Sequence, residues 1–448
     1  MATATASGGA PLVVVKESGA KGLSGTDGTD GAGFNQVRQS KLDNPLLHLF
    51  KTNQLQAVSA PLNTEADLTW TRATEATFAD RYGVIQSAAI DVPREEKGGW
   101  LIEGASTNLA LYSEEFDNAG YTKTRCSITP NDAIAPDGQL TADKLVEDAT
   151  AANNHQIREL YSVITGTMYT YSIYVNAAER DQIRILLSDT GFGVNVTYDF
   201  TDFAAGTIVE SGAGTNSSAK IEQISTDWYR VSVTAEATAT VSANMYVYLL
   251  VLGGTTYDGD GSSGLHIWGV QLEVLPFASS YIQTTSASVT RGADIVNVQC
   301  ENNTAVDIYS WSFTLEMLGV AIGDGTTLDT MLQIQTEDAG TSCAIQFASG
   351  NAITVVTEGN SDGLGSHSPN ETINITISRL SSTSLSSLVD GVTFVDTLIP
   401  DAAKEIKPTG TIHIGRRSNG TANAYFRLKD LRLYDFGLNA DEQAYLAG

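Results

Sequence analysis

The stretch that best indicates the fold is residues 168–176, which reads Met-Tyr-Thr-Tyr-Ser-Ile-Tyr-Val-Asn. Aromatic and β-branched residues of this kind favour strands over helices. Successive strand residues point to opposite faces. One face then carries Tyr169, Tyr171, Ile173 and Val175, and the other carries Thr170, Ser172, Tyr174 and Asn176. The stretch therefore predicts a strand of a β-sandwich.

Further strand-like segments follow at the spacing typical of a sandwich. They are residues 182–187, 194–200, 228–234, 245–252 and 266–273. Together with 168–176 they predict an antiparallel jelly roll over residues 108–285, which is an ordinary size for a domain.

A second set of strand-like segments occupies the last third of the chain. They are residues 311–317, 331–335, 343–347, 353–356, 373–377, 386–389, 411–414 and 428–434. Turn signals at Asp390-Gly391 and Asn419-Gly420 separate some of them. We expect a linker over residues 286–304, a second sandwich over 305–448 and, within it, a short helix over 440–446 capped by Asn439.

The N-terminal region has a glycine at every third position, namely Gly19, Gly22, Gly25, Gly28 and Gly31. This period lets three polyproline-II-like chains meet at a common axis, so residues 19–33 predict a collagen-like, trimeric stem. A flexible Gly/Asp/Thr linker is the alternative. Beyond it we expect a neck over residues 34–63, with a short helix opened by Pro45 and capped by Asp43 or Asn44, and a connector over 64–107.

Composition excludes several classes of function. The 448 residues include 26 Lys and Arg against 52 Asp and Glu, for a net charge of −26. Such a chain repels nucleic acids and anionic membrane surfaces. The longest apolar run, 245–252, is too short for membrane insertion. Cys126, Cys300 and Cys343 are widely spaced and odd in number, which indicates neither a disulfide framework nor a zinc site and fits synthesis in a reducing cytoplasm.

Three groups of local motifs resemble bacteriophage tail-fibre and related virion proteins. The first group leads into a jelly roll like that of carbohydrate-binding modules, and the second covers the body and exit of that module. The first comprises TRAT (71–74), DRYGVI (80–85), PR (93–94), LIE (101–103), TNL (107–109) and LYSEEF (111–116). The second comprises APDG (135–138), ADKL (142–145), WYRVSV (228–233), IWGVQLE (267–273), SYIQTT (280–285) and TRGAD (290–294).

The third group resembles concanavalin-A or laminin-G-like domains. It comprises DG (390–391), IHIG (412–415) and LRLYD (431–435). The resemblance implies a homotrimeric, non-enzymatic fibre on the virion that adheres to a host cell-surface glycan. Residues 1–18 would dock on other tail or capsid proteins, with 12–15 available for strand addition. A polysaccharide-cleaving tailspike and a purely architectural capsid or neck fibre are the alternatives.

The resemblance transfers no binding residue, so the candidates come from chemistry. Sugars need aromatic faces and nearby polar groups, which makes Tyr174, Trp228, Tyr246 and Tyr248 candidate glycan contacts. Aromatic residues at strand spacing are also typical of cores and cross-strand pairs.

The turn at residues 257–262 offers carboxylates that suit calcium. Asp258 and Asp260 could hold a structural ion there, and a solvated glycine turn is the alternative. We predict no catalytic, cofactor-binding or other metal-binding residue, because the chain shows no nucleophile elbow, phosphate loop or helical His pair.

Overall fold

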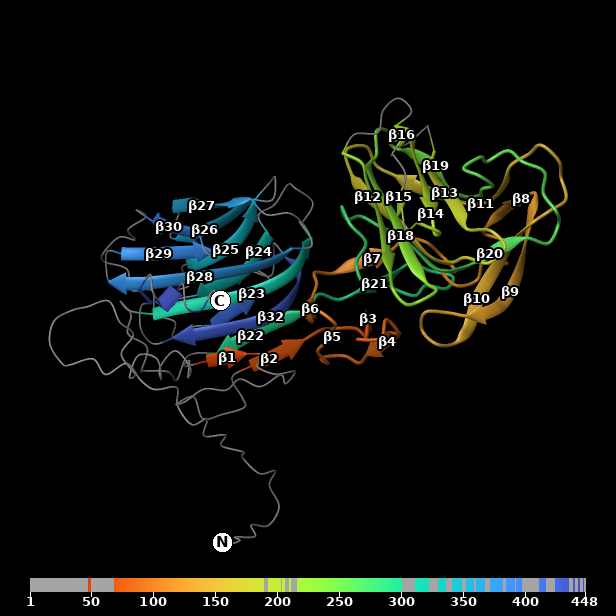
Figure 1. Ribbon diagram of the computed structural model, residues 1–448. Helices are drawn as coiled ribbons and strands as arrows, with labels where there is room; N and C mark the ends of the chain where they lie inside the picture. The colour runs from red at the N-terminus through yellow and green to blue at the C-terminus, as the bar shows by residue number, and fades with distance from the viewer. Residues whose placement is uncertain are drawn as a thin grey trace, which may run out of the picture.

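The computed structural model describes residues 47–49, 68–188, 192–202, 204–205, 209–210, 216–299, 311–321, 329–335, 341–348, 352–357, 360–366, 371–381, 384–390, 392–396, 411–415, 424–434, 438–439, 442–443 and 446. Two lobes built of antiparallel strands lie side by side, with residues 68–108 at the join between them (Figure 1). The all-β prediction is confirmed.

The jelly roll consists of two facing sheets. The first has the order β17 (Ser218–Gln223), β18 (Tyr229–Glu236), β12 (Met168–Asn176), β20 (Gly264–Glu273), β10 (Leu140–Glu147) and β9 (Cys126–Ile134). The second has the order β15 (Ala204–Ala205), β14 (Val194–Asp199), β13 (Gln182–Leu187), β19 (Val241–Leu249), β11 (His155–Val163) and β8 (Thr122–Thr124), with β16 (Val209–Glu210) also paired to β14.

Alternation along these strands builds the core between the two sheets. Tyr169, Tyr171, Ile173 and Val175 of β12, which the alternation placed on one face, are all buried there. Each buried large apolar side chain contributes about 1.5–3 kcal/mol to folding. The opposite face of β12 is also covered, because Tyr174 belongs to a second, smaller cluster outside the sandwich.

The C-terminal sandwich has its own pair of sheets and its own core. One sheet has the order β30 (Val392–Asp396), β29 (Ser384–Val389), β28 (Thr372–Ser381), β23 (Trp311–Ala321), β32 (Tyr425–Tyr434), β6 (Gly99–Ile102) and β5 (Glu95–Glu96). The other has the order β2 (Leu68–Thr71), β22 (Ile295–Gln299), β31 (Thr411–Ile414), β24 (Asp329–Gln335), β25 (Thr341–Ala348), β26 (Ala352–Thr357) and β27 (Asn360–Ser366).

The connector and the expected linker differ from their sequence-based description. Strands β2, β5 and β6 of the connector are part of the C-terminal sandwich, and β22 of the expected linker lies between β2 and β31. A hairpin of β3 (Ala76–Ala79) and β4 (Ile85–Ala88) packs instead on the jelly roll, where Ile85 joins the cluster around Tyr174. A short pair of β7 (Ser106–Asn108) and β21 (Val289–Arg291) closes the join. Both segments are therefore structural parts of the two lobes.

The N-terminal neck differs from its sequence-based description. The neck was expected to be helical, but Leu47–Leu49 forms strand β1, which pairs with Leu431–Leu433 of β32 because that edge offers a ladder. The remaining neck residues, the glycines of the predicted stem and residues 1–18 lie outside the described residues.

At the C-terminus, Asn439 Oδ1 accepts a hydrogen bond from Glu442 N at 3.0 Å, and Glu442 Oε2 accepts one from Asn439 N at 2.9 Å. This reciprocal pair is a capping box, as expected for a helix start. In the described part of the chain, no helix has the length and hydrophobicity needed to cross a bilayer.

Candidate functional site

Two of the four candidate aromatic residues lie on the outward face of the jelly roll. Tyr246 and Tyr248 alternate along β19 with Met245, Val247 and Leu249, which point into the core. Both tyrosines are therefore half-exposed. Their rings stack on each other, with centroids 5.5 Å apart and planes inclined by 29°.

Neighbouring strands place an arginine beside each tyrosine. In the register of the sheet, Arg158 of β11 lies opposite Tyr246, and Arg184 of β13 lies opposite Tyr248. The guanidinium carbon of Arg158 lies 5.7 Å from the centre of the Tyr246 ring, a cation–π contact. We call these four residues the tyrosine face.

Hydrogen bonds hold both guanidinium groups in place. Arg158 Nη1 donates to Asn244 Oδ1 at 2.7 Å, and Arg184 Nε donates to Thr197 Oγ1 at 3.2 Å. An arginine has five N–H donors, so each side chain retains further donors for a ligand. The face thus combines aromatic surface with oriented hydrogen-bond donors.

The charge of this face differs from that of the whole chain. On the outward positions of the described strands β11, β19, β13 and β14, Asp199 carries the only carboxylate. Gln182 Nε2 donates a hydrogen bond to it. The two arginines therefore make the face locally cationic on a chain of net charge −26. This balance favours a neutral or anionic ligand.

The other two candidates lie in the interior, which corrects their assignment. Tyr174 is 2% exposed, and its ring packs edge-on against Trp268 and Tyr281 at centroid distances of 5.3 and 5.9 Å. Trp228 is 5% exposed, and its Nε1 donates to Ile134 O at 3.1 Å. Because protein atoms cover both rings, neither can stack on a sugar.

The alternation in the sequence correctly separated Tyr174 from the core residues of β12 but gave no sign that its face is covered. The β3–β4 hairpin and the chain around Tyr281 provide that cover, and both are distant in sequence. Sequence reasoning also missed Arg158 and Arg184, since cross-strand register cannot be read from a single strand.

The Asp258–Asp260 turn uses both carboxylates within the protein. Asp258 Oδ1 accepts from Ala152 N at 2.7 Å. Asp260 accepts hydrogen bonds from the hydroxyl and N–H groups of Ser263 and Ser262, which hold the pKa of Asp260 well below its usual range. Within the described ranges, no three His, Cys, Asp or Glu side chains are grouped as metal ligands. The calcium site stays a prediction.

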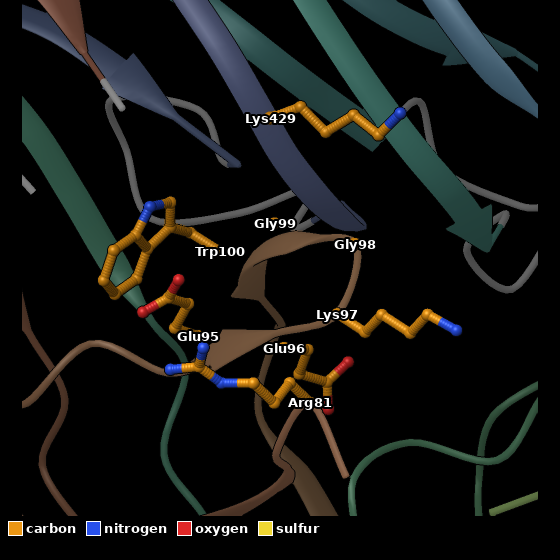
Figure 2. Close-up of a pocket in the computed structure, with 8 residues that line it drawn as sticks. All are labelled: Arg81, Glu95, Glu96, Lys97, Gly98, Gly99, Trp100 and Lys429. Carbon is orange, nitrogen blue, oxygen red and sulfur yellow. The ribbon is translucent and has the colours of Figure 1, made fainter. Parts of the chain in front are cut away.

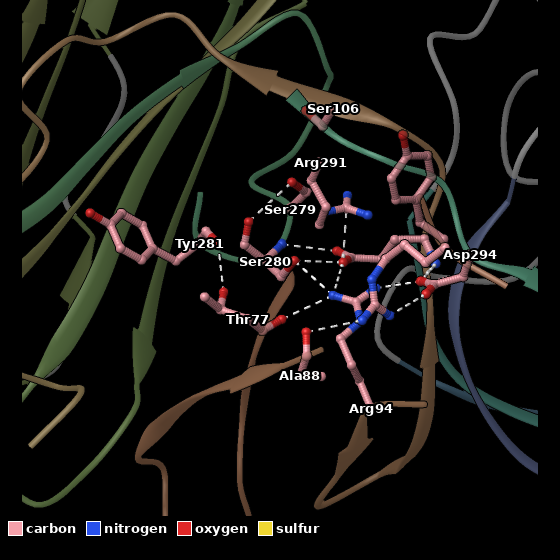
Figure 3. Close-up of polar contacts among 12 residues, drawn as sticks. Thr77, Ala88, Arg94, Ser106, Ser279, Ser280, Tyr281, Arg291 and Asp294 are labelled. Atoms are coloured by element: carbon pink, nitrogen blue, oxygen red, sulfur yellow. Dashed lines mark hydrogen bonds and ion pairs between the residues drawn. The ribbon is translucent and has the colours of Figure 1, made fainter. Parts of the chain in front are cut away.

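Motif residues of the connector and of the expected linker meet at the join in a buried ionic network (Figure 3). Arg72 Nη1 lies 2.9 Å from Asp294 Oδ1, and Arg94 Nη1 lies 2.7 Å from Glu103 Oε2. Arg94 also pairs with Asp294, and Arg291 Nη2 lies 3.5 Å from Glu103 Oε2. These five residues come from the TRAT, PR, LIE and TRGAD motifs.

Electrostatics within this network favour the ionised carboxylates. Burial alone would raise the pKa of Glu103, but Arg291 and Arg94 outweigh it and lower the pKa to about 2. All five side chains are buried, so the network is not positioned to contact a ligand. Its geometry is that of a joint between the two sandwiches.

No family model and no curated protein matches the chain. Solved structures that match include Trypanosoma rangeli sialidase in complex with the inhibitor DANA, at TM-score 0.30 and 9% identity over 68% of this chain and 60% of that one. The chain thus spans about 60% of the length of that structure.

Two other matches have similar values. Trypanosoma rangeli sialidase in complex with sialic acid matches at TM-score 0.27 and 9% identity, over 84% of this chain and 98% of that one. A Bacteroides ovatus "putative carbohydrate binding protein" matches at TM-score 0.26 and 10% identity, over 67% of this chain and 80% of that one. At these values the matches assign neither a family nor a function.

The matches nevertheless correct one prediction. The sequence predicted a protein without enzymatic activity, but the matching structures include sialidases, which are enzymes. That exclusion is contradicted and is not retained.

Proposed function

We propose that this chain is a glycan-binding subunit of a bacteriophage fibre and that the tyrosine face holds the glycan. The observation that carries the proposal is the stacked pair of Tyr246 and Tyr248 flanked by Arg158 and Arg184 on the outward face of the jelly roll. The phage context rests on the motif resemblance.

The chemistry of the tyrosine face suits a sugar. A tyrosine ring covers the apolar side of a pyranose, and its hydroxyl can exchange hydrogen bonds with the hydroxyls of the sugar. The guanidinium groups of Arg158 and Arg184 supply donors on both sides of the pair. The cationic balance also favours glycans that carry carboxylate groups.

A shallow face of this kind binds a single glycan weakly, and a fibre overcomes this by repetition. If the glycines from Gly19 to Gly31 form a trimeric stem, three tyrosine faces act together on one surface. Linked sites can raise avidity by about 10²–10⁴ over one site. The proposed trimer thus serves the proposed binding.

The first experiment measures binding of the fluorescently labelled full chain to an array of bacterial surface polysaccharides. The wild type should bind at least one polysaccharide, and the double variant Tyr246→Ala/Tyr248→Ala should lose most of that binding. Leu160→Ala, an exposed position on the neighbouring strand β11, is the matched control. Equal binding by the wild type and the double variant would contradict the proposed site.

The same samples test the fibre and the possible activity. Sedimentation analysis should give a trimer, and a monomer would contradict the fibre. Deletion of residues 1–18 should leave a trimer that no longer joins virions. Release of new reducing ends from a bound polysaccharide would identify an activity that cleaves it.

A further inference from the structure

A second site that could hold a ligand lies beside β5 and β6, away from the strands that carry the tyrosine face. It is a cavity of about 370 Å³. Its lining residues are Arg81, Glu95, Glu96, Lys97, Gly98, Gly99, Trp100 and Lys429 (Figure 2). Its volume falls within the usual range for ligand pockets, about 300–1,000 Å³. We call it the Trp100 pocket.

The tight hairpin between β5 and β6 lines the pocket, and its second glycine leaves no room for a side chain. Gly99 has a φ of +125°, and a Cβ there would lie 2.5 Å from Leu428 O. A Cβ on Gly98 would lie 2.6 Å from Leu318 Cδ2. The backbone between β5 and β6 therefore lies close against the C-terminal sandwich and positions Trp100 beside it.

Two of the charged lining residues are neutralised by neighbours. Arg427 Nε lies 2.5 Å from Glu96 Oε2, and Glu96 Oε1 also accepts from Ala79 N at 3.1 Å. Lys429 Nζ lies 3.1 Å from Glu316 Oε1. These ion pairs hold the side chains of Glu96 and Lys429 in place beside the pocket. They leave little of the charge of either residue for a ligand.

Three lining residues keep their charge for a ligand. Within the described part of the chain, Arg81, Lys97 and Glu95 form no ion pair, and all three are exposed. Figure 2 shows the Arg81 guanidinium and the Glu95 carboxylate on the side of the Trp100 ring, with the Lys97 ammonium at the other end. Two cations face one carboxylate here, in a chain with twice as many acids as bases.

We infer that the Trp100 pocket binds an acidic oligosaccharide, whose sugar rings carry carboxylate groups. One ring packs on the half-buried indole of Trp100, and its hydroxyl donates to Glu95. Its carboxylate accepts charge-assisted hydrogen bonds from Arg81, and the next acidic unit reaches Lys97. The site lies in a different part of the chain from the tyrosine face and does not depend on it.

The test is a calorimetric titration of the full chain with tetragalacturonate and with its fully methyl-esterified, neutral form. We expect the acid to bind and the ester to bind at least about tenfold more weakly, since charge-assisted hydrogen bonds are lost. Raising the salt from low to about 0.5 M should weaken binding of the acid, because exposed charges are screened.

Variants place the binding in the pocket. Arg81→Ala/Lys97→Ala should weaken binding of tetragalacturonate at least about tenfold. Both side chains are exposed, so the variant should fold normally. Lys220→Ala, an exposed cation paired with Glu222 in the jelly roll, should bind like the wild type.

Tyr246→Ala/Tyr248→Ala should also retain binding of tetragalacturonate, which separates this pocket from the proposed function. No binding of the acid, equal binding of acid and ester, or wild-type binding by Arg81→Ala/Lys97→Ala would each overturn the inference. Loss of binding in the tyrosine variant with retention in the arginine–lysine variant would assign the acid to the tyrosine face and overturn the pocket.

Discussion

Arg72 Nη1 donates to Asp294 Oδ1 at 2.9 Å, and both side chains are fully buried although 222 residues separate them in the sequence. Arg94 and the Trp70 indole donate to the same carboxylate, and so does the backbone of Glu103. Asp294 thus ties the entry into the jelly roll to its exit. Removal of its charge therefore affects several buried donors at once.

Asp294→Asn should destabilise the protein strongly, because it leaves Arg72 and Arg94 buried with less than their full countercharge. Breaking a buried pair by removing one partner costs about 3–5 kcal/mol in the free energy of unfolding. Urea denaturation measures the loss. Glu179→Gln is the control: it removes an exposed partner 2.8 Å from Lys144 and should cost no more than about 1 kcal/mol. Similar small losses in both variants would show that the network is not a structural joint.

Gly269 should tolerate no side chain. Its φ is +61°, and a Cβ would lie 2.9 Å from Tyr174 Cδ2 and 3.2 Å from Tyr281 Cε2. Gly269→Ala should therefore lower the free energy of unfolding by about 2–4 kcal/mol, as the sum of left-handed backbone strain and overpacking.

The control separates these two causes. Gly138 has a φ of +80°, but a Cβ there would meet nothing within 4 Å. Gly138→Ala should cost only the backbone strain, about 1–2 kcal/mol. Equal losses at the two positions in urea denaturation would show that the rings of Tyr174 and Tyr281 do not restrict this site.

Much of the fold follows from local sequence patterns. The alternation in residues 168–176 correctly sorted the side chains of β12 onto its two faces, and Asn439 predicted the cap of the short C-terminal helix. These features depend on neighbours within a few residues. The position of β22 between β2 and β31 depends on pairing across more than 100 residues, so the sequence pattern described it only as a linker.

The candidate site shows the same limit. Sequence chemistry found Tyr246 and Tyr248, whose outward direction follows from the apolar residues between them. It also proposed Tyr174 and Trp228, since nothing in their own strands shows that distant segments bury them. Trp100 lies in the segment that the sequence predicts only as a connector, because the pocket beside it is formed by segments more than 300 residues apart.

Alanine variants of two tyrosines should separate core from surface. Tyr174→Ala should lower the free energy of unfolding by about 3–5 kcal/mol, since it removes a buried ring packed against Trp268 and Tyr281. Tyr248→Ala, at a half-exposed position, should cost no more than about 1 kcal/mol. Thermal and urea denaturation measure both. A larger loss for Tyr248→Ala than for Tyr174→Ala would contradict the placement of these rings.

Two half-buried glutamates should make stability fall as the pH rises. Burial raises the pKa of Glu114 and of Glu159 to about 7, even though hydroxyl groups of Tyr281 and Tyr161 donate to them. In the unfolded chain both titrate near 4.5. Between these values the folded state binds more protons than the unfolded state, so the free energy of unfolding decreases as the pH increases from about 4.5 to about 7.

The size of the effect has an upper limit and a specific control. One group contributes at most about 1.4 kcal/mol per pH unit, and less here because both carboxyls remain partly solvated. Glu114→Gln/Glu159→Gln should flatten the dependence of urea denaturation on pH between 5 and 7, because glutamine does not titrate and its side-chain oxygen can still accept one hydrogen bond from the neighbouring tyrosine. Glu75→Gln, at an exposed position that contributes to the environment of neither carboxyl, should leave the slope unchanged. Parallel curves for the double variant and the wild type would show that both carboxyls titrate as ordinary solvated groups. Burial beside Tyr281 and Tyr161 would then not raise their pKa.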